Sequence, residues 1–353
     1  MKDARNVTKW TKRTANTSQA EDTLITVKGS GVGEIWYSTL AEVAMGRQLM
    51  AVRTKEGSSR FIFQFLLTKR SRFEDLGSGN LIPGLSRAAI LEMEACFPSP
   101  PEQQRIADCL TSLDDLITAQ TQKLDALKTH KKGLMQQLFP REGETVPRLR
   151  FPEFRDAGEW DERTLGSFAS FSSGGTPSKD NPEYWNGSIP WISASSMYEL
   201  MIDKADHYVT PLAIGNGTRI AKKGSILILI RGSMLFKRVP ICVAAIDVAF
   251  NQDVKALDVD ASIETSFLLY QLSAFQSRIP INETGIGAGK IELEHLKGFE
   301  VFIPGIPEQQ KIANCLTSLD DLIAAQTQKL DALKTHKKGL MQQLFPYPEE
   351  VEA

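Results

Sequence analysis

The chain is poor in the residues from which metal centres and disulfide frameworks are built. Its 353 residues include four cysteines and four histidines. The cysteines lie far apart and form no Cys-x-x-Cys pair, so neither a zinc site nor a disulfide framework is predicted. We therefore expect no metal and no cofactor, and we expect reduced thiols, which are the default in the cytoplasm. The cysteines are Cys96, Cys109, Cys242 and Cys315.

Long apolar runs are lacking too. No run of 18 apolar residues occurs, and the N-terminal stretch is polar without the apolar centre of a signal peptide. This pattern predicts a soluble, cytoplasmic protein with no membrane partner.

A strong charge of either sign is absent as well. Lys and Arg total 41 and Asp and Glu total 43, which gives a formal net charge of −2. Global basicity therefore gives no indication of nucleic-acid binding, and any DNA contact has to come from local patches. Residues 1–100 are slightly basic, with 14 Lys and Arg against 10 Asp and Glu.

What the chain does contain is a stretch that occurs twice. Residues 101–140 and 307–346 differ at only three of 40 positions, and the second copy lies 206 positions after the first. A repeat this clear governs the interpretation of the whole chain. Positions expected to face outward, such as Lys128 and Lys132, also match their counterparts. Either the duplication is recent, or both copies present one surface to two copies of the same partner.

Each copy of the repeat predicts one long helix. Apolar residues recur at alternating steps of four and three, which is the spacing of a heptad seam that also holds one Gln and one Lys in each copy. Pro101 and Pro307 suit a first helical turn, and Pro140 and Pro346 end the helices. At a rise of about 1.5 Å per residue, residues 106–138 form a rod of roughly 50 Å. The apolar seam residues are Ile106, Leu110, Leu113, Ile117, Leu124, Leu127, Leu134, Leu138, Ile312, Leu316, Leu319, Ile323, Leu330, Leu333, Leu340 and Leu344.

The narrow apolar stripe indicates that the two helices pack on each other. We favour an antiparallel coiled coil, because it gives the molecule a pseudo-twofold axis, although the intervening segment is long enough for a parallel pair. The alternative is two amphipathic helices that each lie on their own domain and have no external partner.

The helices divide the chain into domains. We expect a first domain at residues 1–100, a helix at 101–140, a linker and second domain at 141–303, a helix at 304–346, and a tail at 347–353. The fold class is α+β, with two mixed α/β domains separated by two long helices. Residues 61–68 are ambiguous between helix and strand, residues 77–80 are predicted as a loop, and order is expected to begin near Thr23. Strands are predicted at residues 24–27, 34–37, 226–230, 241–246 and 299–303.

The two domains also match outside the helices, but more weakly. The sequence Val27-Lys28-Gly29-Ser30 corresponds to Ile230-Arg231-Gly232-Ser233. The halves are unequal, because the segment from Phe151 to Ile226 is much longer than the segment that precedes the corresponding Thr23. We therefore expect the first domain to lack its opening section.

Several motifs resemble a known family, the specificity (S) subunits of type I restriction-modification systems. The repeat carries part of the resemblance, in Pro-Glu-Gln-Gln at Pro101 and Pro307 and in Lys-Gly-Leu-Met-Gln-Gln-Leu-Phe from Lys132 onward. The middle of the chain is similar to the opening of a target recognition domain. The motifs there are Arg150-Phe151-Pro152-Glu153-Phe154, Gly174-Gly175-Thr176-Pro177-Ser178, Tyr184-Trp185 and Ile189-Pro190-Trp191.

This resemblance implies a non-catalytic subunit that recognises DNA within a methyltransferase and endonuclease complex. Each of two target recognition domains would read one half of a split site in double-stranded DNA, and the long helices would dock methyltransferase (modification) subunits, two in number. Endonuclease (restriction) subunits would join through the complex. Because the first domain is short, the alternative is a truncated scaffold that binds methyltransferase but reads only one half-site or none.

If the domains contact DNA, cations on or beside their loops are the expected contacts. Arg binds guanine through a bidentate pair, and both Lys and Arg bind phosphate. Exposed cations without a function are equally compatible with the sequence, and Trp185 and Trp191 are expected in the core. The expected DNA-binding residues are Lys28, Arg47, Lys69, Arg70, Arg72, Lys179, Arg231, Lys237, Arg238 and Lys290.

Catalytic motifs are weak. Gly285–Lys290 resembles a phosphate-binding loop, but three residues separate Gly285 from Gly289 where four are required, and Ile291 replaces the Ser or Thr that binds magnesium. A nucleotide-dependent enzyme that uses this loop is the third hypothesis, and the chain itself is predicted not to be an enzyme.

Overall fold

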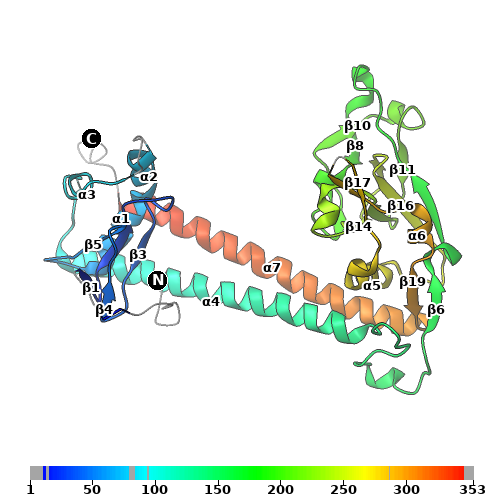
Figure 1. Ribbon diagram of the computed structural model, residues 1–353, viewed down its shortest axis with the longest axis horizontal. Helices are drawn as coiled ribbons and strands as arrows, with labels where there is room; N and C mark the ends of the chain where they lie inside the picture. The colour runs from blue at the N-terminus through cyan, green and yellow to red at the C-terminus, as the bar shows by residue number, and fades with distance from the viewer. Residues whose placement is uncertain (1–10, 13–15, 79–83, 94, 286, 346–353) are drawn as a thin grey trace. The chain divides into compact units, whose positions relative to one another are not determined.

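A computed structural model describes residues 11–12, 16–78, 84–93, 95–285 and 287–345 (Figure 1). The chain divides into two compact units: residues 1–124 with 325–353 form the first unit, and residues 125–324 form the second. This division differs from the expected domain boundaries, since it passes through both long helices. Pro346 and the expected tail at residues 347–353 lie outside the described residues.

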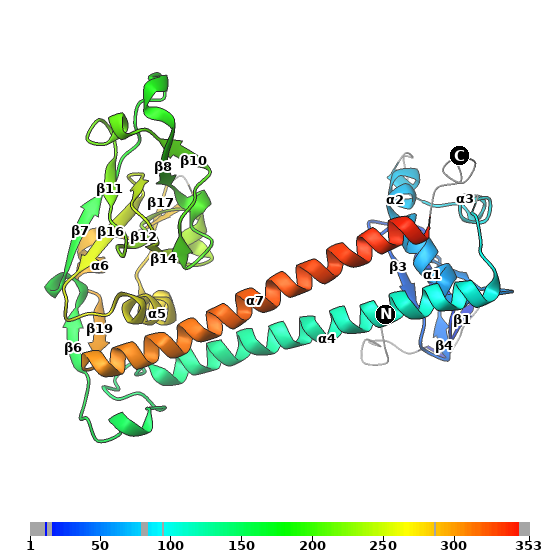
Figure 2. The ribbon, with the colours of Figure 1, turned by 180° about the vertical axis from the view of Figure 1, so that it is seen from behind.

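Two long helices are present, as the repeat predicts. Helix α4 is Pro100–Leu138 and helix α7 is Ile306–Leu344, and each unit contains part of both. In each unit the two helices lie side by side (Figure 1, Figure 2).

Polar contacts give the direction of the two helices within the first unit. Lys337 Nζ lies 2.6 Å from Asp114 Oδ1, and Gln326 donates to Gln120 Oε1 at 2.5 Å. From the first contact to the second, the residue number rises along α4 and falls along α7, so the two helices are antiparallel in this unit.

The second unit contains the equivalent ion pair, between Lys131 Nζ and Asp320 Oδ1 at 2.5 Å. Lys131 and Asp320 are the repeat counterparts of Lys337 and Asp114. The same pair of repeat positions therefore joins the helices in each unit.

The predicted seam residues face the interior. Each of the sixteen apolar seam positions of α4 and α7 is buried or half-buried. Leu116 and Leu322, which lie off the seam, are 39% and 55% exposed. The buried stripe is wider at the start of each helix, where the off-seam residues Ala107 and Ala313 are also buried.

In the residues that the structure describes, the second unit is built from four sheets and two shorter helices. A five-stranded sheet has the order β7-β16-β12-β14-β9, and a four-stranded sheet has the order β10-β8-β15-β11. Strands β13, β18 and β17 form a ribbon, and β19 pairs with β6. The helices are α5 (Thr265–Phe275) and α6 (Leu293–Lys297). The strands are β6 (Asp161–Thr164), β7 (Ala169–Ser173), β8 (Trp185–Ile192), β9 (Met201–Ile202), β10 (His207–Val209), β11 (Arg219–Ala221), β12 (Ile226–Leu229), β13 (Arg231–Gly232), β14 (Ile241–Ala244), β15 (Val248–Phe250), β16 (Val254–Val259), β17 (Asn282–Thr284), β18 (Ala288–Lys290) and β19 (Glu300–Ile303).

The core of the second unit lies between its sheets and the long helices. Strands β12 and β14 are buried along their whole length, as their continuous apolar sequences predict. Phe139, which directly follows α4, packs on Phe267 of α5, with ring centroids 5.6 Å apart. This contact fixes α5 against the long helix.

The first unit contains a smaller set of elements. Its sheets have the orders β3-β2-β5 and β1-β4. The strands are β1 (Thr17–Gln19), β2 (Thr23–Thr26), β3 (Ile35–Tyr37), β4 (Glu42–Ala44) and β5 (Leu49–Val52), and the short helices are α1 (Ser59–Thr68), α2 (Arg70–Ser78) and α3 (Arg87–Leu91). Phe345, which follows α7, packs on Phe61 of α1, with ring centroids 5.2 Å apart. This pair is the counterpart of Phe139 and Phe267 in the second unit.

The duplication therefore extends from the sequence into the fold. Strand pairings β1–β4, β2–β3 and β2–β5 recur as β11–β15, β12–β14 and β12–β16. Gln103 Oε1 accepts from the Ser58 backbone N–H at 3.2 Å, and Gln309 Oε1 accepts from the Glu264 backbone N–H at 2.8 Å. Within the part of the first unit that the structure describes, strands β6 to β10 have no counterpart.

The five strands predicted from the sequence are confirmed as β2, β3, β12, β14 and β19. Two other predictions are wrong. Gly77 and Ser78 belong to α2 rather than to a loop, and order begins before Thr23, because β1 pairs with β4. The ambiguous segment 61–68 is helical, since Ser58 caps α1 by accepting from the Phe61 backbone N–H.

Among the helices within the described ranges, none has the length and apolar character needed to cross a bilayer.

Candidate nucleic-acid interface

The ribbon of the second unit carries two of the predicted DNA-binding cations. Arg231 of β13 lies directly opposite Lys290 of β18. Like charges at directly opposed positions destabilise a strand pair. Lys290 Nζ is neutralised by Glu292 Oε1 at 2.7 Å, while the Arg231 side chain is exposed to solvent. This arrangement suits a bound anion.

Two further predicted cations come shortly after β13 in sequence. Residues Ser233–Phe236 form a short 3-10 helix, and Lys237 and Arg238 come directly after it. Arg238 donates to the Met197 backbone carbonyl at 2.7 Å, which holds the turn in place. Phe236 is 52% exposed, so an exposed aromatic ring stands beside the basic residues. We call this surface, made of Arg231, Phe236, Lys237, Arg238 and Lys290, the basic ribbon.

Lys179 is exposed on the loop after β7. Two indoles hold this loop, because Trp185 Nε1 donates to the Ser178 carbonyl and Trp191 Nε1 to the Gly175 carbonyl, each at 3.0 Å. The two Trp rings also pack edge to face at 5.4 Å. Trp191 is buried, as the sequence predicts, whereas Trp185 is half-buried and packs against the same cluster.

In the described part of the first unit, one isolated bridge stands where the second unit has its ribbon. Lys28 pairs with Gly84 as Arg231 pairs with Lys290. The Leu85 backbone N–H donates to Val27 at 2.8 Å, which matches the bond from Ile291 to Ile230 at the same distance. Gly84 stands where the second unit has Lys290, so one positive charge is missing.

The other predicted cations of the first unit differ in their surroundings. Arg47 and Arg72 are exposed. Arg70 pairs with Glu74 at 2.8 Å and with Glu34, and the hydrogen bond to Glu74 is the main cause that raises the pKa of Arg70. Arg47 and Arg72 thus remain accessible to an anion, while Arg70 is already neutralised.

Lys69 is poorly placed for DNA. Its residue is only 7% exposed, and its Nζ lies 5.3 Å from the centroid of the Phe65 ring. Burial lowers the pKa of Lys69, and the charge of Arg72 adds to this effect.

The described residues of the glycine-rich stretch 285–290 do not form a phosphate cradle. Residues 288–290 belong to β18, whose backbone pairs with both β13 and β17. Thr284 Oγ1 donates to the Ala288 carbonyl at 2.8 Å across the turn. A phosphate-binding loop leads into a helix with its N–H groups unpaired, so the nucleotide hypothesis has no structural support here.

The sequence alone did not reveal the role of Arg150. Its guanidinium donates twice to the Glu308 carboxylate, from Nε and Nη2, each at 2.8 Å. Both side chains are almost fully buried, and the hydrogen bond to Glu308 raises the pKa of Arg150. The linker between α4 and the second domain is thereby attached to the start of α7. The counterpart Glu102 in the first unit is exposed.

Comparison with known proteins adds independent evidence. A family model for the type I restriction modification DNA specificity domain matches residues 1–129 and 157–335. The chain is 32% identical over 240 residues to the type I restriction enzyme EcoR124I/EcoR124II specificity subunit of Escherichia coli. This match covers 67% of the chain but only 57% of that protein. The chain is also 20% identical over 342 residues to the MjaVIII specificity subunit of Methanocaldococcus jannaschii, covering 92% of the chain and 78% of that protein.

Solved structures show the same fold at low sequence identity. The S subunit of a type I restriction-modification system from M. genitalium gives a TM-score of 0.62 at 18% identity, over 94% of this chain and 84% of that one. A chain from a study of complex assembly and conformational transition in the type I system gives 0.58 at 14% identity, over 95% and 84%. These two similarities bear on the fold alone.

Proposed function

Because this chain belongs to the family of type I restriction-modification DNA specificity proteins, we propose that it reads a split site in double-stranded DNA and docks methyltransferase subunits. It contributes recognition and assembly, while the methyltransferase and endonuclease partners supply the chemistry.

The observation that carries this proposal is the duplicated fold. Both units use the same strand pairings beside the same pair of antiparallel helices. Each unit also places a cation, Lys28 or Arg231, at an equivalent bridged position. Two similar readers built on one repeat suit two half-sites, each contacted through phosphate and base edges.

A second candidate function follows from the inequality of the units. The described part of the first unit has no counterpart of β6 to β10, and Gly84 stands in place of Lys290. A chain with one complete reader would bind methyltransferase but recognise only one half-site.

Co-purification with the cognate methyltransferase subunit, followed by duplex binding over a range of salt concentrations, tests the proposal. Arg231→Ala is expected to weaken binding by about 1–3 kcal/mol if Arg231 contacts a base, or to reduce the salt slope by about 1 if it contacts phosphate. Lys297→Ala serves as the control, because Lys297 is an exposed cation on α6 paired with Glu294. Equal binding by both variants and the wild type would exclude Arg231 from the DNA interface.

A further inference from the structure

One connection between paired strands is longer in the second unit than in the first. Residues 230–240 connect β12 to β14, whereas residues 27–34 connect the equivalent strands β2 and β3. The connection in the second unit is therefore three residues longer. Both connections begin with matching sequences, 230–233 and 27–30, so the additional residues come after Ser233.

The longer connection gives the second unit an exposed end that is aromatic and basic. Phe236, Lys237 and Arg238 are all exposed, and we call these three residues the tip. The shorter connection contains no aromatic residue, and it ends on Glu34, which pairs with Arg70. The tip is therefore a feature that distinguishes the second unit from the first.

Buried residues and hydrogen bonds anchor the tip at both ends. Leu235 and Val239, which stand on either side of it, are buried. The backbone N–H groups of Lys237 and Arg238 both donate to the Met234 carbonyl, at 2.9 and 3.0 Å. The tip is thus held in one conformation before it meets a ligand, which lowers the entropy lost on binding.

A glycine of β18 allows the short 3-10 helix that carries Phe236 to lie close to the ribbon. A Cβ at Gly289 would stand 2.9 Å from the Leu235 Cβ and 2.9 Å from the Ile281 Cγ2. Any side chain at this position would therefore displace the helix. Gly289 thus has a structural role, which is to position the tip against β18.

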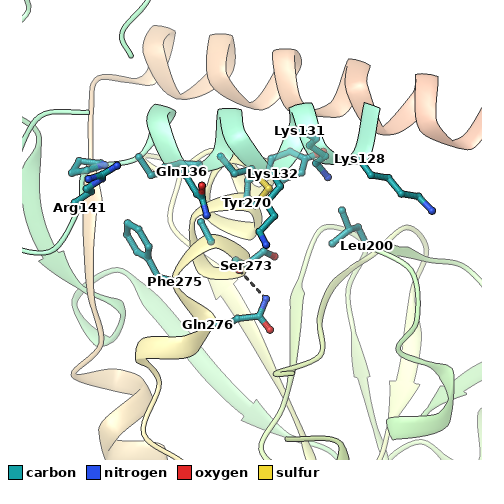
Figure 3. Close-up of a pocket in the computed structure, with 14 residues that line it drawn as sticks. Lys128, Lys131, Lys132, Gln136, Arg141, Leu200, Tyr270, Ser273, Phe275 and Gln276 are labelled. Atoms are coloured by element: carbon teal, nitrogen blue, oxygen red, sulfur yellow. Dashed lines mark hydrogen bonds between the residues drawn. The ribbon is translucent and has the colours of Figure 1, made fainter. Parts of the chain in front are cut away.

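Other aromatic rings that lie beside cations in the second unit are already engaged. Tyr270 and Phe275 line a groove between α4 and α5 together with Lys131 (Figure 3). The Lys131 Nζ lies 4.9 Å from the centroid of the Tyr270 ring, and Phe275 is only 9% exposed. Phe236, by contrast, is 52% exposed beside Lys237, so its ring is available to a ligand.

We propose that Phe236 inserts between two stacked base pairs of duplex DNA, while Arg231 and Lys237 bind the phosphates beside it. The second unit thereby selects a base step that unstacks readily, which is a pyrimidine–purine step. The inference rests on the proposed function and adds recognition of DNA deformability to it.

Charge and exposure favour this mode of binding. Apolar side chains such as Phe serve as wedges that unstack a base step and kink the duplex by about 20–90°. Insertion covers the exposed ring with bases, and the neighbouring cations hold the duplex on the tip by neutralising phosphates. Because the connection in the first unit has no aromatic residue, insertion is expected at one half-site only.

The test uses the complex with the cognate methyltransferase subunit and a duplex selected by the wild-type complex. 2-Aminopurine, which brightens when it is unstacked, replaces one adenine of the duplex at a time. The wild type is expected to brighten a probe at one step, and Phe236→Ala is expected to abolish this brightening at saturating protein. Phe236→Ala is also expected to weaken binding by about 5- to 150-fold, whereas Phe236→Trp should keep both properties.

Two further variants serve as controls. Leu212→Ala is the matched control, because Leu212 is also 52% exposed on a 3-10 helix of this unit but has no cation next to it in sequence. It is expected to change neither the brightening nor the affinity. Lys237→Ala separates charge from insertion, since it is expected to reduce the salt slope by about 1 and to keep the bright step.

The outcomes separate this inference from the function on which it rests. Methyltransferases extrude a target base, which also brightens a probe, so only brightening that Phe236→Ala removes supports insertion. If the wild type binds the duplex and every bright position persists in Phe236→Ala, the inference is overturned and the proposed function stands. If Phe236→Ala instead carries fewer methyltransferase subunits in native mass spectrometry, the ring contacts protein and the inference is overturned. A wild-type complex that selects no duplex overturns both.

Discussion

Glu308 and Glu102 occupy the same position of the repeat, and comparing them tests the buried contact between Glu308 and Arg150 of the linker. Glu308 accepts two hydrogen bonds from Arg150 at 2.8 Å, with side-chain exposures of 3% for Glu308 and 7% for Arg150. Glu102, its counterpart in the first copy of the repeat, is exposed. The change Glu→Gln at each site is chemically identical, so any difference in its effect comes from the surroundings.

The expected loss of folding stability differs greatly between Glu308→Gln and Glu102→Gln. Glu308→Gln leaves the Arg150 guanidinium buried without its counter-charge, and breaking one side of a buried ion pair destabilises a protein by about 3–5 kcal/mol. Glu102→Gln changes a solvated side chain and is expected to change stability by less than about 0.5 kcal/mol. Replacing both partners, as Arg150→Met/Glu308→Met, is expected to recover much of the loss, because no unpaired charge remains.

Denaturant unfolding followed by tryptophan fluorescence measures these effects, because Trp160, Trp185 and Trp191 lie in the second unit with Glu308, and Trp36 lies in the first unit with Glu102. We expect a clear shift of the transition midpoint for Glu308→Gln alone. Equal midpoints for Glu308→Gln and Glu102→Gln would refute this expectation.

Three further predictions concern stability. Burial alone would raise the pKa of Asp22, but hydrogen bonds from Arg53 and from a backbone N–H outweigh burial and lower the pKa. Asp22 therefore stabilises the fold above its unfolded pKa of about 3.9. This contribution to stability is lost as the pH falls through the lowered pKa of the folded state. Acid titration of Asp22→Asn should therefore show a flatter loss of stability than the wild type, and identical acid limbs would contradict this. Gln326→Leu is expected to lower stability by about 1–3 kcal/mol, since it leaves a partly buried Gln120 without its hydrogen-bond partner. The double variant Gln120→Leu/Gln326→Leu should be close to neutral in thermal unfolding. A double variant as unstable as the single one would contradict this expectation. Gly174→Ala places a Cβ 2.0 Å from the Phe250 carbonyl oxygen and should destabilise the protein by about 1–3 kcal/mol. Gly133→Ala places a Cβ in open space within α4 and should stabilise the protein by about 0.5–1 kcal/mol. Calorimetry that shows a change of the same sign for both variants would contradict this pair of expectations.

The long helices could be predicted because their signal is local and repeated. A heptad spacing sustained along the whole of each repeat and bounded by prolines leaves few alternatives. The continuous apolar sequences of β12 and β14 were equally informative. The loop predicted at Gly77 is wrong, because the helix that contains Gly77 is stabilised by the packing of Phe73 in the core of the first unit rather than by local propensity.

The candidate sites were harder to predict, because they depend on tertiary contacts. The sequence indicated Arg231 and Lys290 separately, but only the strand pairing brings them face to face. A lysine in a basic cluster is expected on the surface, yet Lys69 is buried over the Phe65 ring. The partnership of Arg150 with Glu308 joins residues 158 positions apart, and no spacing within one element could reveal it.

The central claim, that this chain recognises DNA through two related readers, is tested most directly by selection from a random duplex library. The complex with the cognate methyltransferase subunit would be used, at a stated salt concentration, because affinity depends steeply on salt. We expect enrichment of two short defined elements separated by a spacer of constant length. A single enriched element would favour the second candidate function, and no enrichment above the starting library would contradict DNA recognition by this chain.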